Sequence, residues 1–411
     1  MKKLRALTLG KVDDQFSFFL IGQTILVMLF VSQIWIEAFY RGESFEAKIG
    51  WLAEDGGGNT YESGIGRHYF SDYSSMIESS GEKNPWQSTN NYPPFAMFLF
   101  KLFSFLPPQV GLITWLLLSA ILLLAPLLFV SKHSFSLEQR LIILLVYVIS
   151  APFLATLDRG NQIAILPILF ILFYLAVHSN ANFSAGIFLG LAVSIKIYPL
   201  ILVIYLIKIR QWATIMWTFT TFFVLTAFSS LYFSNSLNSV FESFRGISSH
   251  NNLASEPQPM VFSGAGILHN MSHLVAGPDS QLTVWINRND FTIALLILIL
   301  VALVSVSKFS NFSLLPYLYC LQLIPTQSYT YTRIWSLVAL VILLRLPSSR
   351  LKSIWLLIVG LNLSPFVVWF QNEVNLFPTL SLFIFLTLLV GQIFNQADVK
   401  KVVQEKVNLW K

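Results

Sequence analysis

The chain has 411 residues, of which 55% are hydrophobic and only 11% are charged, and its formal net charge is +6. Soluble domains carry roughly 25% charged residues, so this composition excludes a soluble globular protein. Apolar runs recur along the whole sequence, which also excludes a soluble domain with a single anchor. We expect one polytopic membrane domain over residues 1–411. Its basic residues lie at predicted helix ends, which argues against a nucleic-acid-binding surface.

The first predicted element is a membrane helix over about 16–36. The basic residues before it look like the start of a signal peptide, but the apolar run is too long and lacks a small-residue cleavage site. We therefore interpret it as a retained helix. The later runs predict an all-α protein with about 10 to 13 transmembrane helices. The candidate spans are 16–36, 110–130, 140–156, 162–178, 184–195, 198–207, 212–233, 291–307, 312–325, 333–346, 353–370 and 376–394.

Lysine and arginine residues between these spans set the predicted orientation, because such residues gather on the cytoplasmic side. Basic residues mark the N-terminus, four connecting segments and the C-terminal tail, 395–411, as cytoplasmic. The outer face then receives the loops 37–93 and 234–290 and three short turns. These turns are 158–162, 326–332 and 371–375.

The first outer loop contains Asp72 followed by Tyr73, beyond a Gly-rich stretch at 56–58. A carboxylate beside aromatic residues at a membrane surface can act as a general base on an acceptor hydroxyl. Aspartate is also a preferred N-cap, so Asp72 can equally serve only to cap a short helix that follows it. The sequence leaves both readings open and predicts that this outer loop is partly helical.

A diproline at Pro93-Pro94 leads into the apolar stretch 94–106, which a second diproline, Pro107-Pro108, ends. Proline fixes the backbone and suits the first turn of a helix. The stretch is too short to cross a bilayer, so we interpret it as an interfacial or re-entrant helix on the outer side.

The turn 158–162 places a carboxylate, a guanidinium and two amides between two apolar runs. These are the side chains of Asp158, Arg159, Asn161 and Gln162. Arg159 can bind a phosphate group, or it can simply anchor the chain at the membrane interface. Arg245, in the second outer loop, has the same two readings.

The basic residues on either side of 184–207 require this segment to enter and leave on the cytoplasmic side. It must therefore break near Lys196-Ile-Tyr-Pro199, where proline disfavours a continuous helix. An ionisable residue at membrane depth is a functional candidate, and lysine is a common phosphate binder. The alternatives are a structural pair with Asp158 or Glu242, or a side chain that extends to the interface.

The sequence does not favour a metal or a cofactor. Only His269 and His273 have a spacing that brings two ligands to one helix face, and no glutamate lies between them. No glycine-rich phosphate loop, dinucleotide fingerprint or serine-nucleophile motif is present. A single cysteine, Cys320, excludes an intramolecular disulfide.

The polar motifs occur together in an order that resembles the polytopic glycosyltransferases of the GT-C superfamily. The similarity is to bacterial mannosyltransferases that use polyprenyl-phosphate sugars, and it covers motifs between about 72 and 212. In chain order these are Asp72-Tyr73, Asn84-Pro85-Trp86, Tyr92-Pro93-Pro94, Arg159-Gly160-Asn161-Gln162, the small-residue helix from Ala185, Lys196-Ile-Tyr198-Pro199-Leu200, and Arg210-Gln-Trp212.

This resemblance implies a GT-C-like fold and inverting transfer of a hexose, with mannose as the expected sugar. The donor would be a polyprenyl-phosphate sugar and the acceptor a hydroxyl of a glycolipid or glycan, at the outer face of the cytoplasmic membrane and without nucleic acid. It implies that Asp72 is the base, and that Lys196, Arg159 and Arg245 bind the donor phosphate. The implied substrate-binding residues are Tyr73, Tyr92, Asp158, Asn161, Gln162, Tyr198 and Tyr331.

One departure from the family pattern concerns Tyr331, which stands where the family often has a histidine. Tyrosine titrates near pH 10, so it is a poor base but a competent hydrogen-bond donor.

The alternative function is a transporter or flippase for a lipid-linked glycan, with a midplane site near Lys196. Such transporters usually contain internal repeats, and none is evident between the two halves of this chain.

Overall fold

The computed structural model describes the chain as nine main stretches and a few single positions. They are 70–82, 92–130, 137–234, 263–277, 279–304, 314–325, 330–346, 349–364 and 374–389, with Gly22, Pro85, Phe135, Asn238, 240–243, Arg245 and 369–370. Several expectations fall outside these residues: the first span 16–36 apart from Gly22, the motif residues Asn84, Trp86 and Asn91, the residues 326–329 and the tail 395–411.

Helices dominate the described residues, which confirms the all-α class expected from the apolar runs. Two strands of two residues each, β1 (Trp369–Phe370) and β2 (Val374–Asn375), form a small antiparallel pair. The helices are α4 (Ser71–Gly81), α5 (Pro94–Phe103), α6 (Pro108–Leu124), η2 (Ala125–Phe129), α7 (Leu137–Val148), α8 (Ala151–Arg159), η3 (Gln162–Ile165), α9 (Leu166–His178), α10 (Asn182–Ile195), η4 (Tyr198–Ile201), α11 (Leu202–Lys208), α12 (Trp212–Ser234), α14 (Gly264–Ala276), α15 (Gln281–Arg288), α16 (Asp290–Val304), α17 (Leu315–Leu323), η5 (Thr330–Ile334), α18 (Trp335–Arg345) and α19 (Arg350–Leu363), followed by a helix over Leu376–Leu389.

Two of these helices are long and apolar enough to cross a membrane by themselves. They are α6 with its continuation η2, over Pro108–Phe129, and α12. Two bent pairs, α7 with α8 (51°) and α15 with α16 (73°), raise the number to four. The other apolar helices are shorter because prolines and polar turns divide the runs, so the expected 10 to 13 spans remain a prediction. The apolar helices nevertheless indicate a membrane protein.

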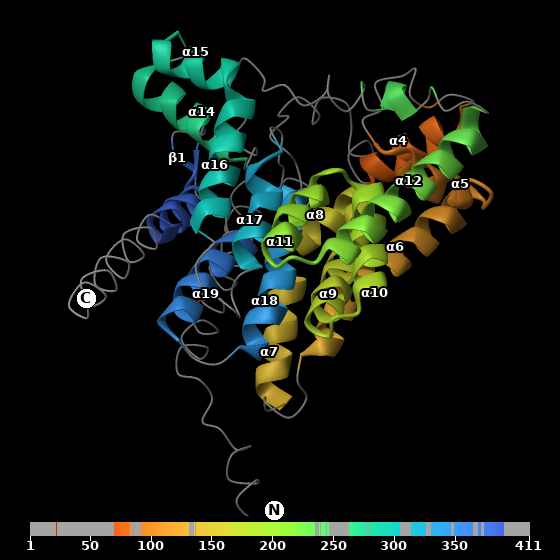
Figure 1. Cartoon of the computed structure of the whole chain (residues 1–411), viewed down its shortest axis with the longest axis horizontal. Coiled ribbons are helices and arrows are strands. Elements are labelled where there is room, and N and C mark those ends of the chain that lie inside the picture. The colour runs from red at the N-terminus through yellow and green to blue at the C-terminus, as the bar shows by residue number, and fades with distance from the viewer. Residues whose placement is uncertain are drawn as a thin grey trace, which may run out of the picture.

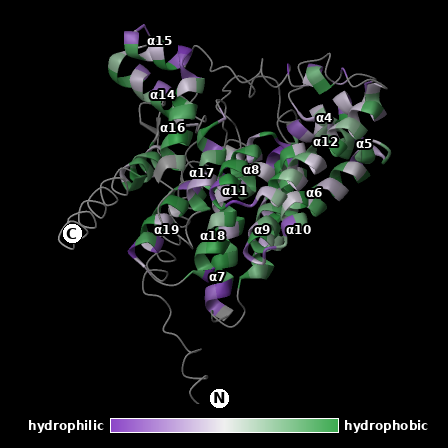
Figure 2. Ribbon diagram, in the orientation of Figure 1, coloured by the Kyte–Doolittle hydropathy of each residue, from purple (hydrophilic) through white to green (hydrophobic). Residues whose placement is uncertain are grey.

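The two predicted outer loops contribute helices to the same end of the molecule (Figure 1). Helix α4 comes from the first loop, α14 and α15 come from the second, and all three lie at the upper end of the view. The start of α7, which follows a predicted cytoplasmic loop, lies at the lower end. Hydrophilic residues gather on α15 and at the start of α7, and the helices between them are mainly hydrophobic (Figure 2). Helices from the two predicted outer loops and the helix after a predicted cytoplasmic loop thus lie at opposite ends of this view, and the membrane orientation stays a prediction.

The segment around Lys196 is a hairpin of two helices. Helix α10 ends at Lys196, whose backbone is extended (φ −144°, ψ 138°), and η4 and α11 follow. After α11, the Gln211 amide donates to the Asn180 side chain at 3.4 Å, and the Thr214 hydroxyl lies 3.3 Å from the Asn182 amide oxygen. Both ends of the hairpin are therefore adjacent. The break expected near Lys196 is therefore confirmed, and entry and exit of the segment on the cytoplasmic side of the membrane stay a prediction.

Two glycines let α10 pack closely on α12. A Cβ atom at Gly186 would lie 2.3 Å from the Cβ of Trp217, and one at Gly190 would lie 2.6 Å from the Cβ of Thr221. No side chain fits at such separations, so glycine is required by the approach of the two backbones. The pairing also shows that α10 and α12 run parallel. The hairpin tip is thereby supported along one side by α12.

Helix α5 is short, as expected, and it packs between α4 and the end of α12. It is ten residues long, from Pro94 to Phe103. The Phe98 ring makes edge contacts with Phe228 and Tyr232 of α12, at centroid distances of 5.2 and 5.1 Å. On its other side, Phe100 contacts Trp115 of α6. These aromatic contacts hold the described part of the first outer loop on the helical bundle.

Candidate functional site

The turn after α8 is fixed by a glycine and a tryptophan. Gly160 caps α8 in the left-handed conformation (φ 62°), and its N–H donates to the carbonyl of Leu157. A Cβ at Gly160 would lie 2.8 Å from the Cβ of Tyr73, so a larger residue would push α4 away. The indole N–H of Trp115 donates to the Gly160 carbonyl at 2.7 Å. The residues on either side of Gly160 are therefore held against α4.

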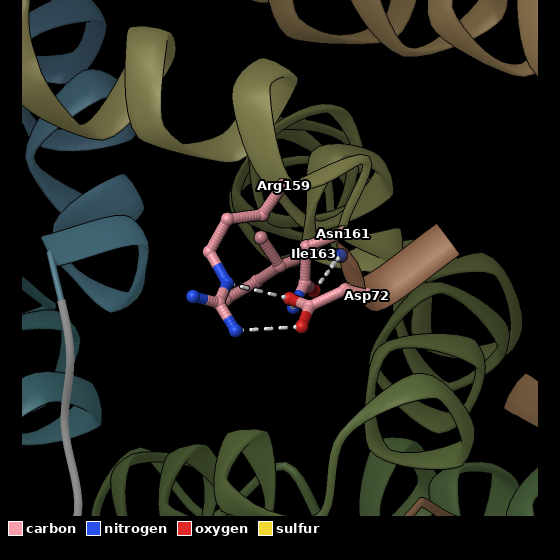
Figure 3. A network of polar contacts seen from close by, with 4 residues as sticks. All are labelled: Asp72, Arg159, Asn161 and Ile163. Atoms are coloured by element: carbon pink, nitrogen blue, oxygen red, sulfur yellow. Dashed lines mark hydrogen bonds and ion pairs between the residues drawn. The ribbon is translucent and has the colours of Figure 1, made fainter. Parts of the chain in front are cut away.

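Asp72 points at this turn and is nearly buried, with 9% of the residue exposed. Its carboxylate accepts two hydrogen bonds from the Arg159 guanidinium, from Nη2 to Oδ1 at 2.8 Å and from Nε to Oδ2 at 3.1 Å. The Asn161 Nδ2 atom donates to Oδ2 at 2.5 Å (Figure 3). Asp72 does not cap α4, because the N-cap residue is Phe70. The structure thus brings together an acidic residue and a turn far apart in the sequence.

Asn161 has both ends of its side-chain amide engaged. Its Oδ1 atom accepts from the backbone N–H of Ile163 at 2.9 Å, which caps η3 and turns the Nδ2 group toward Asp72. A backbone bond from the Phe70 N–H to the Asp158 carbonyl, at 2.7 Å, ties the start of α4 to the end of α8. The carboxylate is therefore held by backbone geometry as well as by side chains.

Lys196 and Tyr92 meet beside this carboxylate. The Lys196 Nζ atom lies 3.9 Å from the centre of the Tyr92 ring, a cation–π contact. The charges of Asp72 and Arg159 are both close enough to act on Lys196. Burial raises the pKa of Tyr92, and the negative charge of Asp72 adds to this, so the hydroxyl stays protonated and can donate. The hairpin tip therefore reaches the same site as α4.

Gln162 and Tyr198 place further polar groups near Tyr92. Both amide atoms of Gln162 and the Tyr198 hydroxyl are buried without a well-formed hydrogen bond among the described residues, although the Tyr92 hydroxyl lies close enough to Gln162 to interact with it. Leaving such a group unsatisfied costs about 1–3 kcal/mol. Tyr73 has a different place, because its ring packs against Phe100 at 5.8 Å in the contact between α4 and α5.

Two expected residues are not placed in this cluster. The Arg245 side chain is exposed, and it forms no ion pair with the cluster in the part of the chain that the structure describes. The backbone of Tyr331 lies in η5, which packs against α8 and η3 and so adjoins the site. The Tyr331 side chain is outside the described atoms, so its role stays a prediction.

Arg333 is a buried charged residue near the site that was not among the predicted site residues. This arginine lies in η5, beside α8, and only 2% of it is exposed. The available signal was a charged residue at the start of the apolar run 333–346, the kind of position where an ionisable side chain usually has a function. Arg333 is also the first residue of the predicted span 333–346, where a charged side chain is ordinary.

The cluster offers acid–base and electrostatic chemistry. It contains one carboxylate, two cations, Arg159 and Lys196, and several neutral hydrogen-bonding groups. Within the described stretches, no group of three or more His, Cys, Asp and Glu side chains is close enough to hold a metal ion. A buried carboxylate can remove a proton from a hydroxyl, and nearby cations can stabilise an anionic leaving group.

Comparison with known proteins supports this chemistry. A family model described as glycosyltransferase family 87 matches residues 90–323, which is more than half of the chain. The matched range includes Tyr92, the turn 158–162 and Lys196, and it begins after Asp72. No curated protein and no solved structure matches the chain.

Proposed function

The chain belongs to glycosyltransferase family 87 and is a glycosyltransferase, and from this premise we propose the reaction that it catalyses. The donor is a polyprenyl-phosphate hexose, with mannose as the expected sugar. The acceptor is a hydroxyl of a glycolipid or glycan. The observation that carries the proposal is the buried carboxylate of Asp72 beside Lys196, at the tip of the hairpin.

In the proposed step, Asp72 removes the proton from the acceptor hydroxyl. The acceptor oxygen then forms a bond to C1 of the hexose, on the face opposite the phosphate. The bond between C1 and the phosphate oxygen breaks, and its electron pair leaves with the lipid phosphate. The anomeric configuration is therefore inverted, and the products are the glycosylated acceptor and a polyprenyl monophosphate.

The leaving group gains negative charge, so a cation near the phosphate lowers the barrier. Lys196 is the expected phosphate ligand whose placement supports this role most directly. Its Nζ atom is held on the Tyr92 ring, from which it can reach a phosphate that enters beside the hairpin tip. Gln162 and Tyr198 are proposed to bind sugar hydroxyls, because their buried polar groups form no well-formed hydrogen bond among the described residues. Asp158 and Tyr331 are proposed to contribute to the same substrate site.

We also propose a polytopic GT-C-like arrangement in the cytoplasmic membrane, with both termini in the cytoplasm. The site then faces the outer side. Two membrane-length helices have exposed apolar side chains that suit contact with lipid, such as Ile121 of α6 and Met216 of α12. A polyprenyl tail would be accommodated along such surfaces, and its phosphate would lie at the polar end of the bundle.

The test is transfer of labelled hexose by the purified full-length chain, with a polyprenyl-phosphate hexose as donor and membrane glycolipid extract as acceptor. We expect Asp72→Asn to lower turnover at least about 1000-fold, because it keeps the size of the side chain and removes the base. The matched control is Glu78→Gln, which neutralises an exposed carboxylate on the same helix and should leave turnover unchanged. Substantial turnover by a folded Asp72→Asn variant would exclude Asp72 as the base.

A further inference from the structure

The hydrogen bonds to Asp72 leave one lone pair of its carboxylate unused by the described side chains. An ionised carboxylate offers about four lone-pair positions, two on each oxygen. Oδ2 accepts from Arg159 Nε and from Asn161 Nδ2, so both of its positions are occupied. Among the described side chains, Oδ1 accepts a hydrogen bond from Arg159 Nη2 alone (Figure 3). The two oxygens are therefore not equivalent.

From this geometry we infer that Arg159 and Asn161 are positioning residues that fix the Asp72 carboxylate and leave Oδ1 to receive the acceptor proton. The inference rests on the proposed function, and it names the reacting atom and the two residues that present it. In the step, the proton passes from the acceptor hydroxyl to Oδ1 as the acceptor oxygen bonds to C1 of the hexose. Asp72 becomes a neutral acid, and Arg159 keeps its proton and its charge.

Asn161 is suited to this task because its amide cannot turn freely. The residue is fully buried, and its Oδ1 atom is held by the Ile163 N–H. A rotation that withdrew Nδ2 from Asp72 would break the cap of η3. The family resemblance implies a substrate contact for Asn161, and its second N–H could make one while the bond to Asp72 stays in place. The geometry therefore assigns Asn161 to the carboxylate.

Arg159 presents two parallel N–H groups to the carboxylate, a geometry that lysine cannot reproduce. The preceding helix α8 and the Gly160 cap direct its side chain toward α4. Arg159 has five N–H groups and directs two of them, side by side, at the two carboxylate oxygens, and this bidentate contact is the observation that assigns it to positioning the base. Lys196, whose Nζ atom lies over the Tyr92 ring, remains available for the phosphate.

The two roles make different kinetic predictions. A residue that positions the base affects kcat, whereas a phosphate ligand affects the KM of the donor. We expect Asn161→Ala and Arg159→Met each to lower kcat about 10- to 100-fold, with both KM values within about twofold of the wild type, since misplacing a reacting group by about 1 Å has an effect of this size. Arg159→Lys keeps the positive charge but has a single donor nitrogen, so its kcat should lie between those of the wild type and Arg159→Met.

The control is Arg288→Lys, an exposed arginine of α15 that should leave both constants unchanged. A donor KM raised at least tenfold in Arg159→Met or Arg159→Lys, with kcat preserved, would overturn the assignment of Arg159. An unchanged kcat in Asn161→Ala would overturn that of Asn161. Absence of hexose transfer by the wild type would instead contradict the proposed function. In that case a double-mutant cycle of thermal stability between Asp72→Asn and Asn161→Ala decides the pairing, and additive effects on Tm would refute it.

Discussion

Lys196 shows how a single charged residue is accommodated at the end of an apolar hairpin. The sequence left open a pair with Asp158 or Glu242, and the structure instead places Nζ over the Tyr92 ring. A cation–π contact partly replaces the hydration of an ammonium group without neutralising its charge. Among the described residues no carboxylate forms an ion pair with Lys196, so an anionic ligand would not have to displace one of them.

At the residue scale we predict that Lys196→Met raises the donor KM about 10- to 100-fold, the loss expected for one charge-assisted contact. The measurement is initial transfer rate against donor concentration at saturating acceptor. The control is Lys101→Met, because Lys101 also lies over an aromatic ring, that of Phe105 at 5.8 Å. Equal donor KM values in the two variants would show that Lys196 does not bind the phosphate.

At the element scale, the hairpin formed by α10, η4 and α11 positions Lys196 at the site. The polar contacts of Gln211 and Thr214 close its open end, and α12 supports it along its length. The requirement that the chain return to the same side followed from the basic residues alone. The glycines on α10 explain how the close packing against α12 is achieved, since a Cβ atom would not fit.

We predict that Gly190→Ala destabilises the protein by about 1–3 kcal/mol, the usual effect of overpacking. The added Cβ would lie 2.6 Å from the Cβ of Thr221, so α10 and α12 must separate. Thermal unfolding in detergent measures the effect as a lower Tm. Gly81→Ala is the matched control, because nothing lies within 4 Å of a Cβ there. If both variants melt at the same temperature, the two helices are not packed as closely as the structure indicates.

At the scale of the whole molecule, charge is sparse and is used in two ways. Basic residues flank the apolar segments and predict their orientation, while a few charged side chains gather in the site. The described carboxylates are spread along the chain and form no group of three with His or Cys that is suited to a metal ion. A monophosphate leaving group needs less positive charge than a diphosphate, so side-chain cations can suffice.

We therefore predict that the purified enzyme retains full activity in excess chelator. The measurement is transfer rate with increasing EDTA, with and without magnesium or manganese in excess over the chelator. The control uses a metal-dependent glycosyltransferase under the same conditions, to show that the chelator is effective. Loss of activity that either metal restores would reassign Asp72 as a metal ligand.

The sequence by itself determined the class of protein, most helix boundaries and the residues to examine. Apolar runs and prolines are local properties, so the start of α5 at the first diproline and the break at Lys196 could be predicted from them. The end of α5 at Phe103, before the second diproline, was not predicted by them. The order of the motifs indicated a glycosyltransferase before any contact was known. The number of spans was less certain, because an apolar run that contains a break does not reveal whether its two halves form one span.

Only the tertiary structure decided which of these residues meet. Asp72 and Arg159 are 87 positions apart, and their pairing depends on how α4 docks on the turn after α8. That docking requires the left-handed Gly160 and the bond from Trp115, neither of which stands out in the sequence. The buried position of Arg333 was missed for the same reason. Contacts between distant segments are set by the packing of whole helices. A local sequence pattern therefore does not show which distant side chain a given residue will contact.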